Sequence, residues 1–96
     1  MFQRGKRVER PSMIVLWRVS DGPRRVGFAV GRQIRGAVRR NRVRRRLREA
    51  YRAARAVAPA GVDLVVIGRS AALTLALGAL VDDMRAAFGV VATQRP

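Results

Sequence analysis

One basic segment in the middle of the chain, residues 35–55, constrains the fold more than any other feature. It holds ten of the 21 lysine and arginine residues, against a single acid, Glu49. Its apolar residues recur at spacings of three and four, which predicts an amphipathic helix over residues 37–58. The apolar stripe of that helix consists of Val43, Leu47, Ala50, Tyr51, Ala54 and Val57. Such a helix needs a core to cover the stripe and a polyanion to balance the opposite side.

The flanking segments predict the elements that cover the stripe. Apolar alternation predicts strands over residues 12–20 and 25–31, and the turn residues Asp21-Gly22-Pro23 predict that they form an antiparallel hairpin. The apolar run over residues 62–68 predicts a strand covered on both faces. A final helix is expected over residues 75–90, with an inward face of Leu77, Leu80, Val81, Met84 and Phe88. This order of elements predicts a mixed α+β fold.

Length and composition narrow the classes of protein that the chain can belong to. Ninety-six residues predict a single domain, residues 1–96, and a hydrophobic fraction of 49% argues against intrinsic disorder. A net charge of +15 is typical of a nucleic-acid-binding protein. The chain has no cysteine and no histidine, which excludes disulfides, thiolate metal sites and the commonest general base. Its apolar runs are too short for a membrane span or a signal peptide, so we expect a cytoplasmic protein.

Two alternative interpretations of the basic helix fit the sequence less well. A solvated helix face in an arginine-rich chain is one, since lysine occurs once among the 21 basic residues. A solvated face usually mixes charges of both signs, and this one has Glu49 alone. A helix lying on a membrane surface is the second, but the apolar stripe lacks the bulky anchors of such helices. We therefore expect RNA or DNA as the partner.

Several motifs in sequence order carry a resemblance to one known family. The central motif is Arg40-Asn41-Arg42, which continues through Val43, Arg44, Arg45, Leu47 and Arg48. It is preceded by Arg25-Val-Gly-Phe and by Ala37-Val38. Downstream of it lie the strand-like residues 63–69 and the helical residues 77–88. Together these segments, which span nearly the whole chain, resemble the bacterial ribonuclease P protein subunit.

The resemblance implies a fold and a function. The fold would be a small sheet packed with the basic central helix and a C-terminal helix, as in ribonuclease P proteins and similar ribosomal proteins. The partners would be the catalytic ribonuclease P RNA and precursor tRNA, and no protein partner or membrane is implied. The assembled ribonucleoprotein would be an endoribonuclease that removes the 5′ leader of precursor tRNA. Its hydrolysis would depend on Mg²⁺ held mainly by the RNA, so no residue of this chain is expected to be catalytic.

The resemblance also assigns site residues. The RNA-binding set would be Arg32, Arg39, Arg40, Asn41, Arg42, Arg44, Arg45, Arg48 and Arg52. The leader would bind between the sheet and the first helix of the family, where the aromatic positions fall on Trp17 and Phe2. An indole stacks on any base, with Gly27 and Ala29 leaving room beside it, whereas the alternative is that Trp17 fills the core. The position of a metal is not assigned.

The chain departs from the family pattern in three places. It begins where the family's N-terminal basic helix would end, so that helix is expected to be largely missing. Residues 34–37 read Ile-Arg-Gly-Ala where the family usually has Ile-Gly-Asn-Ala, which removes a candidate helix cap. Gln33 replaces a usual basic residue. These changes bear on the leader contacts more than on docking to the RNA.

Two further functions remain open at the level of sequence. A general RNA- or DNA-binding module would show the same charge but would bind tRNA with or without a leader. A self-sufficient nuclease would need clustered carboxylates for two metal ions. Asp82 and Asp83 are the only adjacent pair of acids, and we expect them to point to different sides of the last helix and to be solvated or to act as caps.

Overall fold

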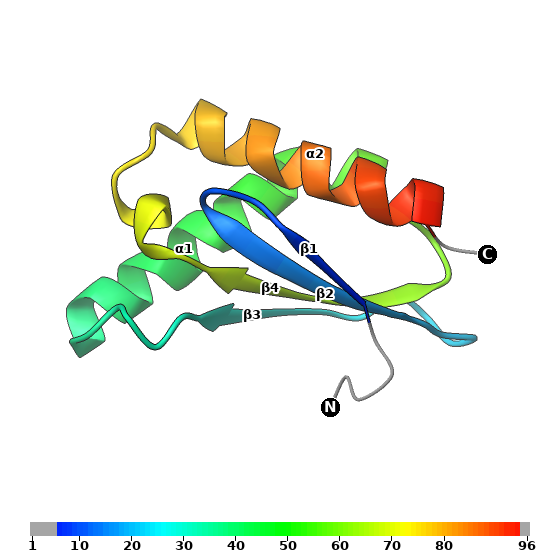
Figure 1. The fold of residues 1–96 in the computed structure, drawn as a ribbon, viewed down its shortest axis with the longest axis horizontal. Coiled ribbons are helices and arrows are strands. Elements are labelled where there is room, and N and C mark those ends of the chain that lie inside the picture. The colour runs from blue at the N-terminus through cyan, green and yellow to red at the C-terminus, as the bar shows by residue number, and fades with distance from the viewer. Residues whose placement is uncertain (1–5, 95–96) are drawn as a thin grey trace.

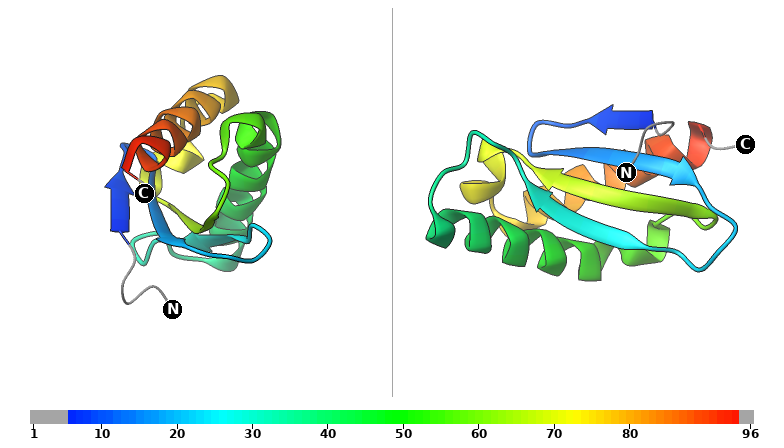
Figure 2. Two further views of the ribbon diagram at one scale, coloured as in Figure 1. Left: turned by 90° about the vertical axis from the view of Figure 1, so that its right-hand side faces the viewer. Right: turned by 90° about the horizontal axis from the view of Figure 1, so that it is seen from below.

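The structure, a computed structural model, describes residues 6–94 and consists of a four-stranded sheet with two helices on one face (Figure 1). In chain order the elements are β1 (Lys6–Glu9), β2 (Met13–Val19), β3 (Val26–Val30), α1 (Ala37–Ala54), β4 (Val62–Gly68) and α2 (Leu77–Gln94). Two short 3-10 segments, η1 (Arg55–Val57) and η2 (Ser70–Leu73), follow α1 and β4. Helix α1 packs on β3 and β4, and α2 packs on β1 and β2 (Figure 2). The expected α+β fold is confirmed.

The order of the strands differs from the expected hairpin. The sheet runs β1-β2-β4-β3, so β4 lies between the two strands that the Asp21-Gly22-Pro23 turn connects. β4 pairs antiparallel with β2 and parallel with β3, with Leu64 facing both Trp17 and Val26. The hairpin prediction is wrong because β4 lies between β2 and β3 and hydrogen-bonds to both of them.

Strand β1 is an element that the sequence pattern did not predict. It pairs antiparallel with β2 at the edge of the sheet. Among its four residues only Val8 is buried, and Lys6, Arg7 and Glu9 are exposed. A strand with one buried residue shows no alternation of apolar and polar side chains that the sequence could reveal. Its charged side chains are typical of an edge strand, where they discourage pairing with a further strand.

The core lies between the helix-covered face of the sheet and the two helices. Its largest fully buried side chains are Phe88, Met13, Leu47, Leu64, Leu80 and Met84. The expected stripes are confirmed, except that Val57 and Leu77 are 51% and 37% exposed. Helix α1 ends at Ala54, earlier than expected, because the chain tightens into η1 ahead of Pro59, which has no N–H to continue the helix.

Helix α1 sits unusually close to the end of β4. At Gly68 an added Cβ would overlap a methyl group of Val43, so only glycine fits there. At the start of the helix, Gly36 precedes α1 with φ at 91°, a left-handed conformation that favours glycine. Gly36 makes no side-chain cap, as the loss of the family's asparagine predicts. The two glycines fix where α1 starts and how near it lies to the sheet.

Candidate nucleic-acid interface

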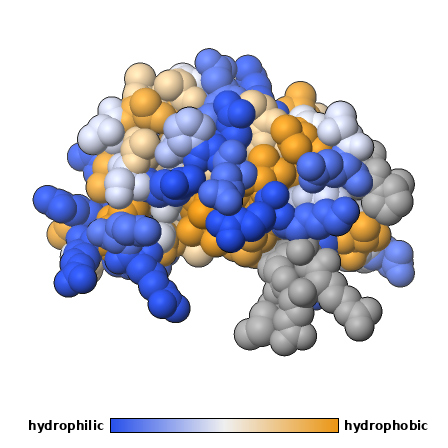
Figure 3. Space-filling model, in the orientation of Figure 1, coloured by the Kyte–Doolittle hydropathy of each residue, from blue (hydrophilic) through white to orange (hydrophobic). Residues whose placement is uncertain are grey.

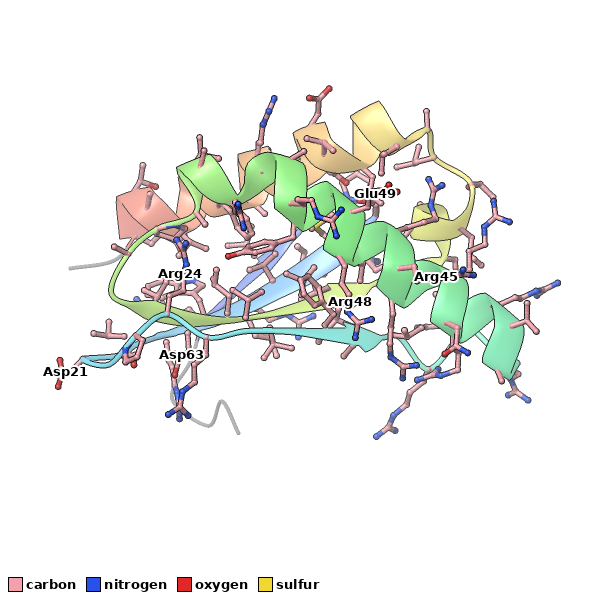
Figure 4. All side chains as sticks on the ribbon, turned by 180° about the vertical axis from the view of Figure 1, so that it is seen from behind. Asp21, Arg24, Arg45, Arg48, Glu49 and Asp63 are labelled. Carbon is pink, nitrogen blue, oxygen red and sulfur yellow. The ribbon has the colours of Figure 1, made fainter. Side chains whose placement is uncertain are left out.

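Five arginines of α1 point away from the core and form what we call the arginine ridge. All five side chains are exposed, and they follow one another at spacings of three or four: Arg39, Arg42, Arg45, Arg48 and Arg52. Within residues 6–94, none of the five makes a hydrogen bond or an ion pair with another side chain or with the backbone. Figure 4 shows Arg45 and Arg48 on the outer side of the helix. The ridge is therefore open to a polyanion.

The opposite side of α1 holds the ridge in place. Val43, Leu47, Ala50 and Ala54 are fully buried against the sheet and α2. In Figure 3 hydrophilic side chains gather at the end of the molecule where α1 begins. Because the helix is fixed by its core side, the arginines are positioned before any partner binds.

Arg40 has a different set of partners from the one expected. Its guanidinium donates hydrogen bonds to the backbone carbonyl oxygens of Val30, Gly31 and Ile34, at 3.3, 3.2 and 2.9 Å. Three acceptors on one connection hold the β3–α1 loop against the helix. We therefore assign Arg40 to the positioning of α1 and leave it out of the ridge.

Arg46 is a second arginine of α1 that faces the protein. Its Nε donates to the carbonyl oxygen of Ala72 at 2.8 Å, and its Nη2 donates to that of Leu75. Both acceptors lie in or just after η2, so this side chain fastens the β4–α2 connection to α1. A count of basic residues does not distinguish such arginines from those that face a partner.

The remaining members of the predicted RNA-binding set lie beside the ridge. Asn41 is exposed, and its Oδ1 accepts a hydrogen bond from Arg44 at 3.3 Å. Arg44 is half-buried. Arg32 is exposed in the loop that leads into α1. Asn41 and Arg44 thus lie on α1 between arginines of the ridge, and Arg32 lies in the loop before the helix.

Trp17 does not offer a stacking surface. Its side chain is 2% exposed and lies on the helix-covered face of the sheet, so the core interpretation is confirmed and the leader-stacking interpretation is corrected. By strand register, Trp17 shares its face with Val26 and Phe28, whereas Gly27 and Ala29 lie on the other face. Alternation shows which residues share a face but not which face is covered. Phe2, the other expected leader residue, lies outside the described residues.

The other face of the sheet carries no helix within residues 6–94. We call it the open sheet face, and its half-buried residues are Ile14, Leu16, Gly27, Ala29, Val65 and Ile67. The strand β4 is therefore covered fully on one side only, contrary to the expectation. At one margin, Arg18 forms an ion pair with the buried Asp63 at 3.5 Å. The result is an apolar floor with Arg7 of β1 and Arg18 of β2 on the same face.

The two adjacent acids of α2 point in different directions, as expected, but only one is solvated. Asp82 is exposed, whereas Asp83 is 8% exposed and binds Ser12 and Arg10. Burial raises the pKa of Asp83, but the hydrogen bonds from Ser12 and Arg10 outweigh it and hold the pKa below its usual value. The prediction that Asp83 is solvated or acts as a cap is wrong, since its carboxylate is buried and binds Ser12 and Arg10 of the β1–β2 turn.

No other feature of the described residues suggests a protein-held metal or a membrane span. Residues 6–94 contain no group of three or more histidine, cysteine, aspartate or glutamate side chains placed to hold a metal ion. Neither α1 nor α2 is long and apolar enough to cross a membrane.

Comparisons with known proteins agree on one family. The family model for ribonuclease P matches residues 1–92. The ribonuclease P protein component of Gluconacetobacter diazotrophicus is 45% identical over 85 residues, covering 85% of this chain and 73% of the relative. That of Acidothermus cellulolyticus is 38% identical over 92 residues, covering 93% and 77%.

Solved structures show the same fold. The RNase P protein of Thermotoga maritima superposes with a TM-score of 0.79 at 26% identity, covering 99% of this chain and 88% of that one. The RNase P protein of Staphylococcus aureus has a TM-score of 0.72 at 19% identity, covering 95% and 79%, which supports the fold alone. With a matching family model and relatives above 30% identity along most of its length, the chain belongs to the ribonuclease P protein family.

Proposed function

We propose that this protein is the protein component of ribonuclease P and works in the cytoplasm with the catalytic RNA to remove the 5′ leader of precursor tRNA. The observation that carries the proposal is the arginine ridge. Five exposed guanidinium groups without partners in residues 6–94 lie on a helix whose other side is fully buried. Family membership supports ribonuclease P RNA as the polyanion that binds this surface.

The chemistry of the ridge suits docking to a folded RNA. Guanidinium groups stay charged and bind phosphate through two parallel N–H bonds. From Arg39 to Arg52 the ridge extends for about 20 Å along the helix at 1.5 Å per residue. A surface of that length contacts several phosphates at once, and each contact releases counterions, so affinity depends on salt.

The open sheet face is our candidate for the 5′ leader. A single-stranded leader exposes its base faces, and the aliphatic floor around Leu16 and Val65 covers them without reading base edges. Gly27 and Ala29 keep that floor low, so a strand can lie across it. Arg7, which lies opposite Leu16 on the neighbouring strand, carries a guanidinium on this face that forms an ion pair with Glu9 at 3.4 Å and that a phosphate would have to share. This assignment replaces Trp17.

In this proposal the chemistry belongs to the RNA. The acids of residues 6–94 form no cluster that fits a catalytic metal, and Asp83 is committed to Ser12 and Arg10. The Mg²⁺ that the resemblance implies would be held mainly by RNA phosphates, where it would supply polarisation of the scissile phosphodiester. The protein contributes by binding the leader and by screening the charge of the two RNAs.

Reconstitution tests the proposal. The protein is mixed with ribonuclease P RNA at low Mg²⁺, and cleavage of precursor tRNA is measured alongside binding of tRNA with and without a leader. We expect stimulated cleavage and tighter binding of the form that carries a leader. Equal binding of both forms without stimulation would favour the alternative, a general RNA-binding module without leader specificity.

A further inference from the structure

A cleft of about 570 Å³ lies beside the first turns of α1, between that helix and η2. Its lining falls into three chemical groups. Two ridge arginines, Arg39 and Arg42, stand on one side. Apolar side chains come from Ile34 and Leu73, and neutral polar groups come from Gln33, Ser70 and Thr74. Clefts of about 300–1,000 Å³ are typical of sites for small organic molecules. A single nucleotide is a molecule of this size class.

The walls of this cleft are held by hydrogen bonds that reach across the fold. Arg46 joins α1 to the carbonyl oxygens of Ala72 and Leu75, which fixes η2 relative to the helix. Arg40 fixes the β3–α1 loop, which supplies Ile34, by donating to that residue's carbonyl oxygen at 2.9 Å. Ile34 is itself 4% exposed. The cleft is therefore present in the unbound protein.

The lining matches the two halves of a nucleotide. Within residues 6–94 neither Arg39 nor Arg42 has a hydrogen-bond or ion-pair partner, so both are available for a phosphate. Leu73, which is half-buried, gives an apolar surface for the flat face of a base, whereas Ile34 is buried and forms part of the wall behind the cleft. Gln33, Ser70 and Thr74 present donors and acceptors for its edge. A paired strand of A-form RNA turns its bases inward and does not fill such a site, whereas an unpaired base does.

We propose that this cleft takes one unpaired nucleotide of the ribonuclease P RNA, with its phosphate at Arg39 and Arg42 and its base against Leu73. The inference rests on the proposed function, because it takes the RNA docked on the ridge as the source of the nucleotide. The cleft is continuous with the arginine ridge, because Arg39 and Arg42 belong to both. An RNA docked on the ridge can therefore supply the nucleotide. The cleft adds a contact of fixed position to a ridge that by itself recognises only charge.

Site-specific crosslinking locates the occupant. The chain has no cysteine, so Thr74→Cys can be labelled uniquely with a photoreactive group and bound to ribonuclease P RNA. Thr93→Cys, exposed near the far end of α2, is the matched control. We expect crosslinks from position 74 at one or two unpaired nucleotides and few from position 93. Crosslinks spread over helical RNA, or no more frequent than from position 93, would overturn the proposal.

Filling the cleft provides a second test. Thr74→Phe adds bulk at the cleft without changing charge, and Thr93→Phe adds the same bulk elsewhere. We expect Thr74→Phe to weaken binding to ribonuclease P RNA at least about fivefold, and Thr93→Phe to leave it unchanged. Circular dichroism and thermal unfolding confirm that both variants fold.

An abasic substitution at the crosslinked nucleotide completes a double-mutant cycle. We expect it to weaken binding of the original protein and to have no added effect on Thr74→Phe, because both changes remove the same contact. Additive losses would show that base and cleft do not meet. If the unchanged protein does not bind this RNA at all, the proposed function fails. If it binds and Thr74→Phe binds equally well, only the cleft assignment fails.

Discussion

The hydroxyl and the backbone N–H of Ser12 both donate hydrogen bonds to one carboxylate oxygen of Asp83, a residue 71 positions further along the chain. The other oxygen accepts from Nε of Arg10 at 2.9 Å. Ser12 is fully buried and Asp83 nearly so. These bonds join the β1–β2 turn to α2, and so set the position of the second helix over the sheet.

The first prediction concerns this buried carboxylate. Asp83→Asn should lower the free energy of unfolding by about 1.5–3 kcal/mol near neutral pH, because hydrogen bonds to a charged group are lost. The pKa of Asp83 is held below its usual value, so its contribution is complete above about pH 4 and disappears as the pH falls through the folded-state pKa. Urea unfolding at several pH values measures both effects.

Asp82→Asn is the matched control for Asp83→Asn. Asp82 is the exposed neighbour on the same helix, so its substitution removes the same charge without the contacts to Ser12 and Arg10. It should leave stability nearly unchanged. Two results would contradict this role of Asp83. One is an equal decrease in the free energy of unfolding for Asp82→Asn and Asp83→Asn. The other is a decrease for Asp83→Asn that is as large in acid as at neutral pH.

A second prediction follows from the close approach of α1 to β4. Gly68→Ala should destabilise the protein by about 1–3 kcal/mol, because the new methyl group overlaps Val43 and forces the helix to shift. Gly89→Ala, at an exposed helical glycine with open space around it, should instead stabilise by about 0.5–1 kcal/mol. Thermal unfolding compares the stability of the two variants. If Gly68→Ala left stability unchanged, α1 would not lie as close to β4 as the structure shows.

The third prediction separates structural from RNA-binding arginines. Arg40→Ala should cost about 1–3 kcal/mol of stability, since the carbonyl oxygens of Val30, Gly31 and Ile34 lose their donor. Arg42→Ala should leave stability unchanged and weaken RNA binding. Chemical unfolding and an RNA titration on both variants provide the comparison. If Arg40→Ala kept full stability and bound RNA more weakly, Arg40 would be an RNA-binding residue and not a structural one.

The fourth prediction distinguishes the two faces of the sheet. Trp17 is the only tryptophan, and because it is buried its fluorescence should not change when leader RNA binds. Val65→Glu places a negative charge on the open sheet face and should remove the preference for precursor tRNA over mature tRNA. Thr93→Glu carries the same charge change on α2 and should keep that preference. Strong quenching of Trp17 fluorescence by the leader would instead support stacking of a leader base on Trp17.

The helices and the basic face could be predicted from the sequence because their signals are local. Val43, Leu47, Ala50 and Ala54 are buried as their spacing predicts, and the Arg40-Asn41-Arg42 motif identified the family. The strand order could not be predicted in this way, because it depends on pairing between distant segments of the chain. Periodicity shows that Leu64 points to one face, but it does not show that β4 lies between Trp17 and Val26.

The roles of single polar residues also depend on contacts between distant parts of the chain. Arg40 and Arg42 look alike in sequence, yet the carbonyl oxygens around Gly31 engage only the first. Asp83 looks solvated in the sequence because its partner, Ser12, lies near the other end of the chain. The resemblance implies a leader-binding role for Trp17, whereas the packing of two helices decides which face of β2 is buried.

The central claim is that the arginine ridge is the surface on which the RNA docks. The most direct test measures the affinity of the protein for ribonuclease P RNA over a range of salt concentrations, with the variant Arg45→Ala/Arg48→Ala beside the original. We expect weaker binding, a slope of log affinity against log salt that is shallower by about 1.4–1.8, and an unchanged thermal unfolding curve. An unchanged affinity and slope in the variant would contradict the claim.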